Sequence, residues 1–224
     1  MNVLITGISK GLGHALAREY AQKGDTVLGI SRGVPIGLPQ QIRHKVADVT
    51  RDDTVDTVRS MLEGVPCLDL LINNAGCGSR GYKADEVEVA ELSYQIELHC
   101  IGAFRVTQAA LPKLHQSSNP KIINLTSRIA SISQHLAGTF TGRTFSYPYR
   151  IAKCAQNMLT VCLAGDPSLE GITVAAINPG TLRTDSGSTD AEYSAEEAAQ
   201  NIALLIQKIT DFGIYHAFSE KAYF

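Results

Sequence analysis

The chain has 224 residues, of which 44% are hydrophobic, and its formal net charge is −2. We expect one domain over residues 1–224, because this length suits an α/β domain and can bury a sizeable core. The near-neutral charge without basic runs excludes a nucleic-acid partner, and no apolar stretch is long enough to cross a membrane. Five scattered cysteines and the lack of a charged leader predict a reduced, cytoplasmic protein, and no Cys/His spacing indicates a metal site.

Short apolar runs alternate with amphipathic segments along the chain. Helical periodicity marks segments near 12–20, 55–62, 92–106, 152–162 and 202–209, and the third helix is expected to end before Pro112. Strands are predicted at 2–6, 26–31, 43–47, 68–73, 121–126 and 172–177, with a weaker one near 213–218. This alternation predicts a doubly wound α/β fold, in which helices cover both faces of a parallel sheet and ligands bind at the carboxyl ends of the strands.

The first predicted strand leads directly into a glycine-rich turn, Gly7-Ile8-Ser9-Lys10-Gly11-Leu12-Gly13, and an amphipathic segment follows. Glycine permits a tight turn and a close approach of the backbone to a ligand, because no Cβ stands in the way. The free N–H groups and the positive dipole end at the start of a helix suit a phosphate group. The three parts together predict a phosphate-binding cradle, with an ordinary strand-to-helix turn as the alternative.

The second predicted strand ends in Ser31-Arg32, without an acidic residue. In a nicotinamide dinucleotide site, an acid at this place would bind the adenosine ribose hydroxyls and would repel a 2′-phosphate. A guanidinium is well shaped to hold a phosphate, and Lys10 in the glycine turn supplies a second cation. These cations favour NADP(H) over NAD(H) as the cofactor. An NAD site and two solvated surface cations are the alternatives.

Two further strand ends are predicted to face the same ligand. Asp48 and Val49 follow the third strand, where they would contact an adenine ring. The fourth strand ends in Asn73-Asn74-Ala75-Gly76, whose small residues let the backbone pass beneath a flat cofactor and whose amides can tie neighbouring strands together. A glycine turn after a buried strand is the alternative interpretation of this second motif.

Residues suited to proton transfer come later in the chain. Tyr149 and Lys153 lie at i and i+4, on one face of a predicted helix. A nearby cation favours the phenolate and lowers the pKa of tyrosine from its usual value of about 10. Ser127, at the end of the fifth strand, carries a hydroxyl that can orient a substrate carbonyl. A Y-x-x-x-K spacing is common by chance. It becomes informative here because it follows the glycine turn, the Asn73–Gly76 motif and the serine at the end of the fifth strand, in that order.

Together these motifs resemble the short-chain dehydrogenase/reductase family, in the form with a T-G-x-x-x-G-x-G cofactor motif. The resemblance covers nearly the whole chain and includes Asn178-Pro179-Gly180 with Thr184. The segments around Ser127 and Tyr149 are similar to the branch of small carbonyl reductases that includes Sniffer and the C-factor signalling protein. The family implies a seven-stranded parallel sheet in a doubly wound Rossmann fold. It also implies a homodimer or homotetramer, joined through the helices at residues 90–114 and 149–164.

The resemblance implies a role for each matched residue. Tyr149 would be the general acid/base, Lys153 would lower its pKa and hold the nicotinamide ribose, and Ser127 would position the carbonyl. The implied reaction is NADP(H)-dependent reduction of an aldehyde or ketone to an alcohol, or the reverse, and a catalytically weak NADP-binding signalling protein is the alternative. The implied cofactor-binding residues are Gly7, Ser9, Lys10, Gly11, Leu12, Gly13, Ser31, Arg32, Asp48, Val49, Asn74, Ala75, Gly76, Tyr149, Lys153, Pro179, Gly180, Leu182 and Thr184.

One position departs from the family pattern. The family has an asparagine in the long helix before the fifth strand, where it binds a water that links the lysine to solvent. Here the run Glu97-Leu98-His99-Cys100-Ile101-Gly102 places His99 at that position. A neutral imidazole can both accept and donate a hydrogen bond. We therefore predict that His99 takes part in proton delivery to Tyr149, with simple packing inside the helix as the alternative.

A small carbonyl or alcohol compound is the predicted substrate, and two segments are expected to line its site. One contains Cys77 and Ser79, and the other contains Phe140 and Phe145, for which aromatic packing over the core is the alternative. Long irregular stretches in a compact domain are often functional. They are predicted at 33–41, 77–86, 130–147 and 184–192, and the short polar stretch after Thr184 predicts a partly open site.

Overall fold

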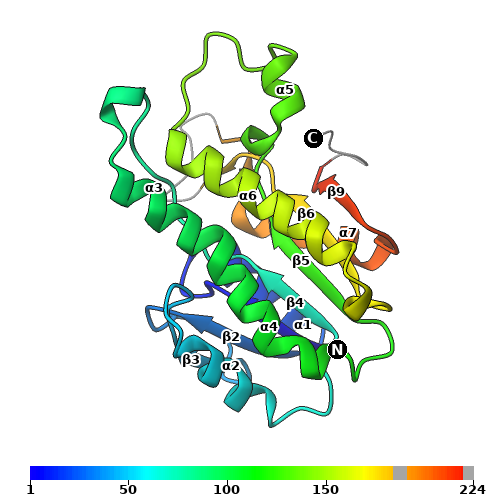
Figure 1. Ribbon diagram of the computed structural model, residues 1–224. Helices are drawn as coiled ribbons and strands as arrows, with labels where there is room; N and C mark the ends of the chain where they lie inside the picture. The colour runs from blue at the N-terminus through cyan, green and yellow to red at the C-terminus, as the bar shows by residue number, and fades with distance from the viewer. Residues whose placement is uncertain (184–190, 219–224) are drawn as a thin grey trace.

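In the computed structural model, residues 1–183 and 191–218 are described. Seven parallel strands form one sheet in the order β3-β2-β1-β4-β5-β6-β9 (Figure 1). Their bounds are β1 Asn2–Thr6, β2 Thr26–Ser31, β3 Arg43–Val46, β4 Leu70–Asn73, β5 Lys121–Leu125, β6 Thr173–Asn178 and β9 Gly213–His216. The predicted doubly wound fold with seven parallel strands is therefore confirmed, including the weak last strand.

Seven α-helices occur in the described residues. They are α1 Gly11–Gln22, α2 Thr54–Leu62, α3 Val89–Ile96, α4 Gly102–Leu114, α5 Ile132–Leu136, α6 Tyr147–Ala164 and α7 Ala195–Lys208. In Figure 1, α2, α4 and α6 cover one face of the sheet, and α1 and α7 lie behind it. In the described part of the chain, no helix is both long and apolar enough to span a membrane.

The strands are buried on both faces, which explains their continuous apolar sequences. In β1, Val3 and Ile5 pack into the core beneath α1 and α7, whereas Leu4 packs into the core beneath α2 and α4. Successive side chains point to opposite faces of a sheet, so a single strand contributes to both cores. Because a core packs against each face, the sheet is a fixed support. Residues at its carboxyl edge can therefore be positioned to form a site.

The order of the strands reverses next to β1. The chain passes from β1 outward to β2 and β3, and it then returns to β4, which pairs with the other side of β1. In such a sheet, the connections on the two sides of this reversal leave a crevice at the carboxyl ends of the strands. The glycine turn after β1 and the motif after β4 meet at this point.

The long helix predicted before the fifth strand differs from the observed one. It consists of α3, a π-helical turn at Glu97–Ile101 and α4, which contains Pro112 and continues to Leu114. Proline removes one backbone hydrogen bond, but the fully buried side chain of Leu114 and the bond from His115 N to Leu111 O (3.0 Å) retain the last turn. The prediction that this helix ends before Pro112 was wrong.

Short elements occupy some stretches that were expected to be irregular. They are the 3-10 turn at Ala84–Glu86 and the turn at Arg128–Ala130 followed by α5. A two-stranded pair, β7 Leu182–Arg183 and β8 Tyr193–Ser194, flanks the predicted stretch 184–192, most of which lies outside the described residues. Each is too short to show a periodic pattern in the sequence. Figure 1 shows α5 and its flanking segments projecting beyond the start of α6, at the rim of the site.

Candidate active site

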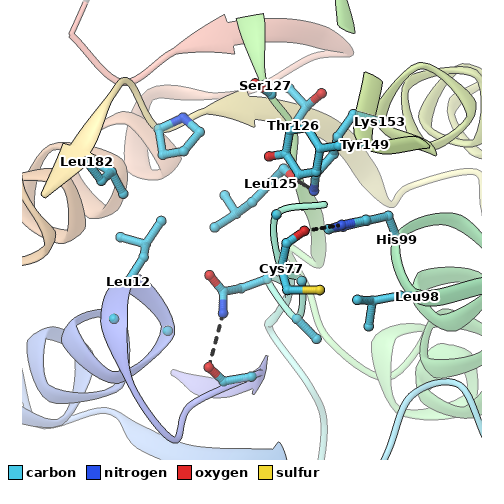
Figure 2. A pocket seen from close by; sticks show the side chains of 18 of the residues that line it. Leu12, Cys77, Leu98, His99, Leu125, Thr126, Ser127, Tyr149, Lys153 and Leu182 are labelled. Carbon is cyan, nitrogen blue, oxygen red and sulfur yellow. Dashed lines mark hydrogen bonds between the residues drawn. The ribbon is translucent and has the colours of Figure 1, made fainter. Parts of the chain in front are cut away.

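A cavity lies along the carboxyl edge of the sheet and is lined by residues that follow β1, β2, β3, β4, β5 and β6 (Figure 2). It contains every predicted catalytic and cofactor-binding residue except Thr184, which lies outside the described residues. One continuous cavity therefore joins two groups of residues. We call the part around residues 7–13, 31–32 and 74–76 the cofactor half, and the part around Ser127, Tyr149, Lys153 and His99 the catalytic half.

The glycine turn is packed so closely that neither Gly7 nor Gly13 has room for a side chain. Gly7 has a φ of +79°, and a Cβ there would lie 2.8 Å from the Cα of Ala75. A Cβ on Gly13 would lie 2.3 Å from both the side-chain nitrogen of Asn74 and the carbonyl oxygen of Gly7. Glycine at these positions thus allows α1 to begin directly against the ends of β1 and β4.

Asn74 joins the ends of β1 and β4. Its side-chain nitrogen donates to the carbonyl oxygens of Thr6 (2.8 Å) and Gly7 (3.3 Å). In return, the Thr6 hydroxyl oxygen accepts hydrogen bonds from the backbone N–H groups of Asn74 (3.0 Å) and Ala75 (2.9 Å). The adjacent Asn73 donates to Asn124 Oδ1 (2.9 Å) and so joins β4 to β5. The prediction that amides tie neighbouring strands is confirmed.

The end of β2 carries the cation that was predicted to select the cofactor. Arg32 lines the cavity, and its Nη1 donates to the hydroxyl of Tyr94 (3.0 Å), which comes from α3. The hydroxyl of Ser31 donates to Gly33 O (2.8 Å) and also contacts Nε2 of His44 (2.9 Å). Lys10 lines the same part of the cavity. The sequence patterns gave no signal for Tyr94, which lies 62 residues from Arg32.

Asp48 and Val49 line the cavity beyond β3, and two arrangements fix them there. The Asp48 carboxylate accepts from the backbone N–H (3.0 Å) and the hydroxyl (2.9 Å) of Thr50. Arg105 of α4 donates from Nη1 to Val49 O (2.6 Å) and also forms ion pairs with Asp52 (3.0 Å) and Glu97 (2.9 Å). This partly buried guanidinium holds the loop after β3 against α4.

Tyr149 and Lys153 enter the catalytic half from the first turns of α6. The Lys153 ammonium donates to Leu125 O (2.7 Å) and to Gln156 Oε1 (2.9 Å), and its Nζ lies 5.9 Å from the centre of the Tyr149 ring. Burial lowers the pKa of Lys153 to about 7. The lysine is therefore held by backbone and amide oxygens as well as by its place beside the tyrosine.

The pKa of Tyr149 differs in direction from the sequence-based expectation. Burial raises it to about 12, and hydrogen bonding with Ser127 opposes this rise. We expected Lys153 to lower the pKa of Tyr149, but loss of solvation of the phenolate is the largest effect, and the group that opposes it is Ser127 rather than Lys153. Tyr149 is consequently a neutral phenol at physiological pH. Figure 2 shows the Tyr149 ring beside Lys153, with Ser127 at the end of β5 above it.

His99 lies in the π-helical turn between α3 and α4, fully inside the protein. Its ring meets the Tyr149 ring edge-on, with 5.3 Å between the ring centres. Its Nε2 lies 3.1 Å from Cys77 O (Figure 2), and because a carbonyl only accepts, Nε2 carries the proton. Its Nδ1 has no hydrogen-bond partner among the described residues. Burial, together with the charge of Lys153, holds the pKa of His99 well below its usual range.

The substrate side of the cavity is formed by loops that contact one another. Cys77 and Ser79 line it as predicted, and the Ser79 hydroxyl accepts from Tyr149 N (3.1 Å). Phe145 lines the cavity, whereas Phe140 is buried and packs on His135 and Phe145, as the alternative interpretation held. Pro179, Gly180 and Leu182 form the opposite wall. Sequence reasoning did not select Gln156, Arg128 or Arg143, although the two arginines line the cavity.

The residues of the cofactor half fit a dinucleotide that carries phosphate groups. The cradle at Gly7 and Gly13 is a space that a Cβ would fill. The residue that precedes α1, Lys10, makes no side-chain cap hydrogen bond to the start of the helix, and backbone N–H groups at a helix start suit a pyrophosphate. Arg32 and Lys10 then supply cations at the end of β2 and in the turn.

Comparisons with known proteins agree with this geometry. The C-signal protein of Myxococcus xanthus is 30% identical over 139 residues, which are 62% of this chain and 80% of that protein. The NADPH-dependent pterin aldehyde reductase of Arabidopsis thaliana is 29% identical over 225 residues, covering 93% of this chain and 88% of that protein. The solved structure of carbonyl reductase Sniffer of D. melanogaster has the same fold, with a TM-score of 0.89 at 22% identity, over 100% of this chain and 99% of that one.

The family comparison covers most of the chain. The model for short chain dehydrogenases matches residues 1–194, which include the glycine turn, the Asn74 motif and the residues of the catalytic half. The chain belongs to the short chain dehydrogenase family.

Proposed function

We propose that this protein is an NADP(H)-dependent oxidoreductase that reduces an aldehyde or ketone to an alcohol, or catalyses the reverse. The observation that carries the proposal is the presence of Ser127, Tyr149 and Lys153 in the same cavity as the glycine cradle and Arg32. The name of the Arabidopsis relative, an NADPH-dependent reductase of a pterin aldehyde, supports both the cofactor and the carbonyl substrate.

In this proposal, NADPH supplies the hydride when it is bound. The backbone at residues 7–13 would hold its pyrophosphate, and Arg32 with Lys10 would hold the 2′-phosphate of its adenosine. Asp48 and Val49 would contact the adenine. Pro179, Gly180 and Leu182 would line the nicotinamide, and Thr184 belongs to this set as a prediction only.

The side chains of the catalytic half would orient the substrate and supply the proton. Ser127 would donate a hydrogen bond to the carbonyl oxygen, which stabilises negative charge as it develops there. Tyr149 would give its phenolic proton to that oxygen, and its raised pKa keeps the phenol protonated and ready to do so. Lys153 would stabilise the phenolate that remains. Its hydrogen bonds to Leu125 and Gln156 fix the ammonium for this task.

His99 is the neutral group beside Tyr149 in this scheme. Its protonated Nε2 is bound to Cys77 O, so only Nδ1 is left as an acceptor. A part for His99 in proton delivery remains a prediction. It is tested by the pH dependence of turnover in His99→Asn, and an unchanged turnover number with an unchanged pH profile would contradict it.

The consumption of NADPH, followed by its absorbance, tests the proposed function against a panel of aldehydes, ketones and quinones. Tyr149→Phe removes the proton donor and is expected to lower kcat at least a hundredfold, the usual contribution of a general acid. Tyr147→Phe is the matched control, because it removes a phenol hydroxyl from the exposed residue two positions earlier. Undiminished turnover in Tyr149→Phe, or no turnover of any compound by the unaltered protein, would overturn the proposal.

A catalytically weak NADP-binding protein with a signalling or regulatory role is the second candidate. Two observations favour it. The Lys153 ammonium already donates to two protein oxygens. Burial also raises the pKa of Tyr149. The C-signal protein of Myxococcus xanthus is among the relatives. Tight NADPH binding without turnover in the same panel would support this candidate and reject the first.

We also propose that two copies of the chain associate through the outer surface of α4 and α6, which cover the same face of the sheet in Figure 1. Exposed apolar side chains gather there, with Met158 exposed by 62% and Val161 by 44% on α6, and Phe104 by 39% on α4. Light scattering after size exclusion would give the mass in solution. A monomer at all concentrations would contradict a dimer or tetramer.

We further propose that residues 1–224 form one domain and that the protein functions in the cytoplasm.

A further inference from the structure

The substrate side of the cavity has basic side chains that the proposed chemistry does not use. Arg128 follows Ser127 directly and is half-buried, and Arg143 lies on the exposed segment that leads to Phe145. Both line the cavity that also contains Ser127 and Tyr149. A charged group that is partly removed from water is costly unless an opposite charge or good hydrogen bonds compensate for it.

The other cations in the cavity have such compensation. Arg32 donates to Tyr94, and Lys153 donates to Leu125 O and Gln156. Arg183 donates to Glu192 O (3.0 Å) and pairs with Glu197 (3.5 Å). These guanidinium and ammonium groups are thereby held in place by the protein itself.

Arg128 and Arg143 are different in this respect. Within residues 1–183 and 191–218, neither guanidinium donates a hydrogen bond or forms an ion pair, and the contact of Arg143 is with the Phe145 ring, at 5.8 Å. The charge of Arg128 acts on His216, whose pKa is lowered by burial first and by Arg128 second, and is raised by Glu192. Among the described residues Arg128 forms no ion pair with that glutamate, so its charge is not neutralised by a direct contact.

The phosphate groups of a dinucleotide do not account for these arginines. The glycine cradle follows β1, whereas Arg128 follows β5, and β4 lies between these two strands. Neighbouring strands are about 4.8 Å apart, so the two strand ends are separated by about 10 Å. Arg128 is instead next to the serine that would orient the carbonyl.

We infer that the carbonyl substrate of this protein carries a carboxylate, which binds Arg128, while Arg143 attracts it at the open edge of the cavity. The inference rests on the proposed function and names its substrate class. A guanidinium binds a carboxylate through two parallel hydrogen bonds, which gives orientation as well as affinity. Ile129 and Phe145, which also line the cavity, would contact the apolar body of the substrate.

Matched pairs of substrates test this inference. 4-Carboxybenzaldehyde is compared with its methyl ester, and succinic semialdehyde with its methyl ester, at saturating NADPH. Each ester keeps the aldehyde and most of the shape but lacks the charge. We expect kcat/KM to be at least tenfold higher for each acid than for its ester, and we expect this ratio to fall as salt is added, because salt screens the exposed Arg143.

Variants then assign the effect to a residue. Arg128→Gln is expected to reduce the acid-to-ester ratio about tenfold or more, mainly through the KM of the acid, and Arg143→Gln is expected to reduce it less. Arg18→Gln, on the exposed side of α1, is the control that should leave the ratio unchanged. Two outcomes would overturn the inference: an acid-to-ester ratio of kcat/KM near one in the unaltered protein, or an unchanged ratio in Arg128→Gln. In either case, turnover of the esters would still uphold the proposed function. A raised KM for NADPH instead of the acid in Arg128→Gln would assign Arg128 to the cofactor and overturn the inference as well.

If no aldehyde is reduced, the anion site can still be tested by calorimetric titration with benzoate, and with uncharged benzamide as its control, in the presence of NADP⁺. Binding of benzoate that is lost in Arg128→Gln, with no reduction of any aldehyde, would uphold the anion site and reject the proposed reductase. Absence of both turnover and benzoate binding would overturn the anion site too.

Discussion

The cofactor half of the cavity is built mainly from backbone groups, whereas the catalytic half is built from side chains that come from distant parts of the chain. At the end of β1, Gly7 and Gly13 touch Asn74 and Ala75 without room for a Cβ. At the end of β5, Lys153 is positioned by a backbone oxygen and by Gln156, and Tyr149 lies against His99.

This difference determines what each half tolerates. A close contact between backbone atoms leaves no alternative to glycine, so the cofactor half is specified by residue type at each position. A side chain can be exchanged for another that fills the same space and satisfies the same donors. The resemblance to the family implies that His99 takes the place of an asparagine, which would be such an exchange. Substitutions at the glycines should therefore disrupt the structure of the cofactor half, whereas substitutions of the residues that surround Tyr149 and Lys153 should change the properties of the catalytic half without disrupting its structure.

Gly13→Ala should have the largest effect. The new Cβ would lie 2.3 Å from Gly7 O and from the Asn74 side chain, so α1 must move away from the end of β4. We expect a loss of about 3 kcal/mol in the free energy of unfolding, measured in urea, and no measurable NADPH binding. Gly165→Ala is the control, because its Cβ would meet Val161 O at an ordinary 3.6 Å. Equal, small losses in both variants would show that the cradle can relax.

Arg32→Ala should have the next largest effect, on cofactor choice rather than on folding. Arg32 lines the cavity at the end of β2, and a charge-assisted hydrogen bond contributes about 1.5–3 kcal/mol. We expect the Kd of NADPH to rise at least tenfold and that of NADH to change little. Tyr94→Phe, which removes the hydroxyl that receives the Arg32 bond, should give a smaller change in the same direction. Equal losses for both cofactors would remove the basis for NADP(H).

The same difference explains which features could be predicted from the sequence. The strands, the order of the motifs and the residues of the cofactor half follow from short local patterns, such as the apolar run before Gly7. The sequence also selected the residues that line the catalytic half, but it did not indicate their environment. The pKa of Tyr149 rises because the phenol is buried, and burial depends on how α3, α6 and the loop after β4 pack. No local pattern reports that packing, and the partners Gln156 and Tyr94 were missed for the same reason.

Gln156→Leu tests the catalytic half with a moderate effect. The variant keeps the size of the side chain but removes the amide oxygen that accepts a hydrogen bond from Lys153, in a fully buried place. We expect a loss of about 1–2 kcal/mol in the free energy of unfolding and a shift in the pH profile of kcat, because the buried ammonium loses one of its two acceptors. Gln207→Leu, at an exposed position of α7, controls for the loss of a glutamine. An unaltered pH profile would mean that Leu125 O alone positions Lys153.

The smallest effect concerns His99 and the stability of the protein in mild acid. The pKa of His99 is held well below its usual range in the folded protein, whereas in the unfolded chain it is about 6.5. Below pH 7 the unfolded chain therefore binds more protons than the folded protein, and the folded state loses stability as the pH falls. His44 and His216 act in the same direction, so the measurement is the difference between two proteins.

Urea unfolding at pH 7 and pH 6 measures this contribution. Because one proton changes the free energy by at most about 1.4 kcal/mol per pH unit, His99→Asn should reduce the pH-dependent loss by less than about 1 kcal/mol. His115→Asn, at an exposed position after α4, should leave the loss unchanged. An identical loss in His99→Asn and in the unaltered protein would mean that His99 can take up a proton inside the folded protein. The imidazole would then be able to carry a proton beside Tyr149, and the catalytic half would contain a second acid.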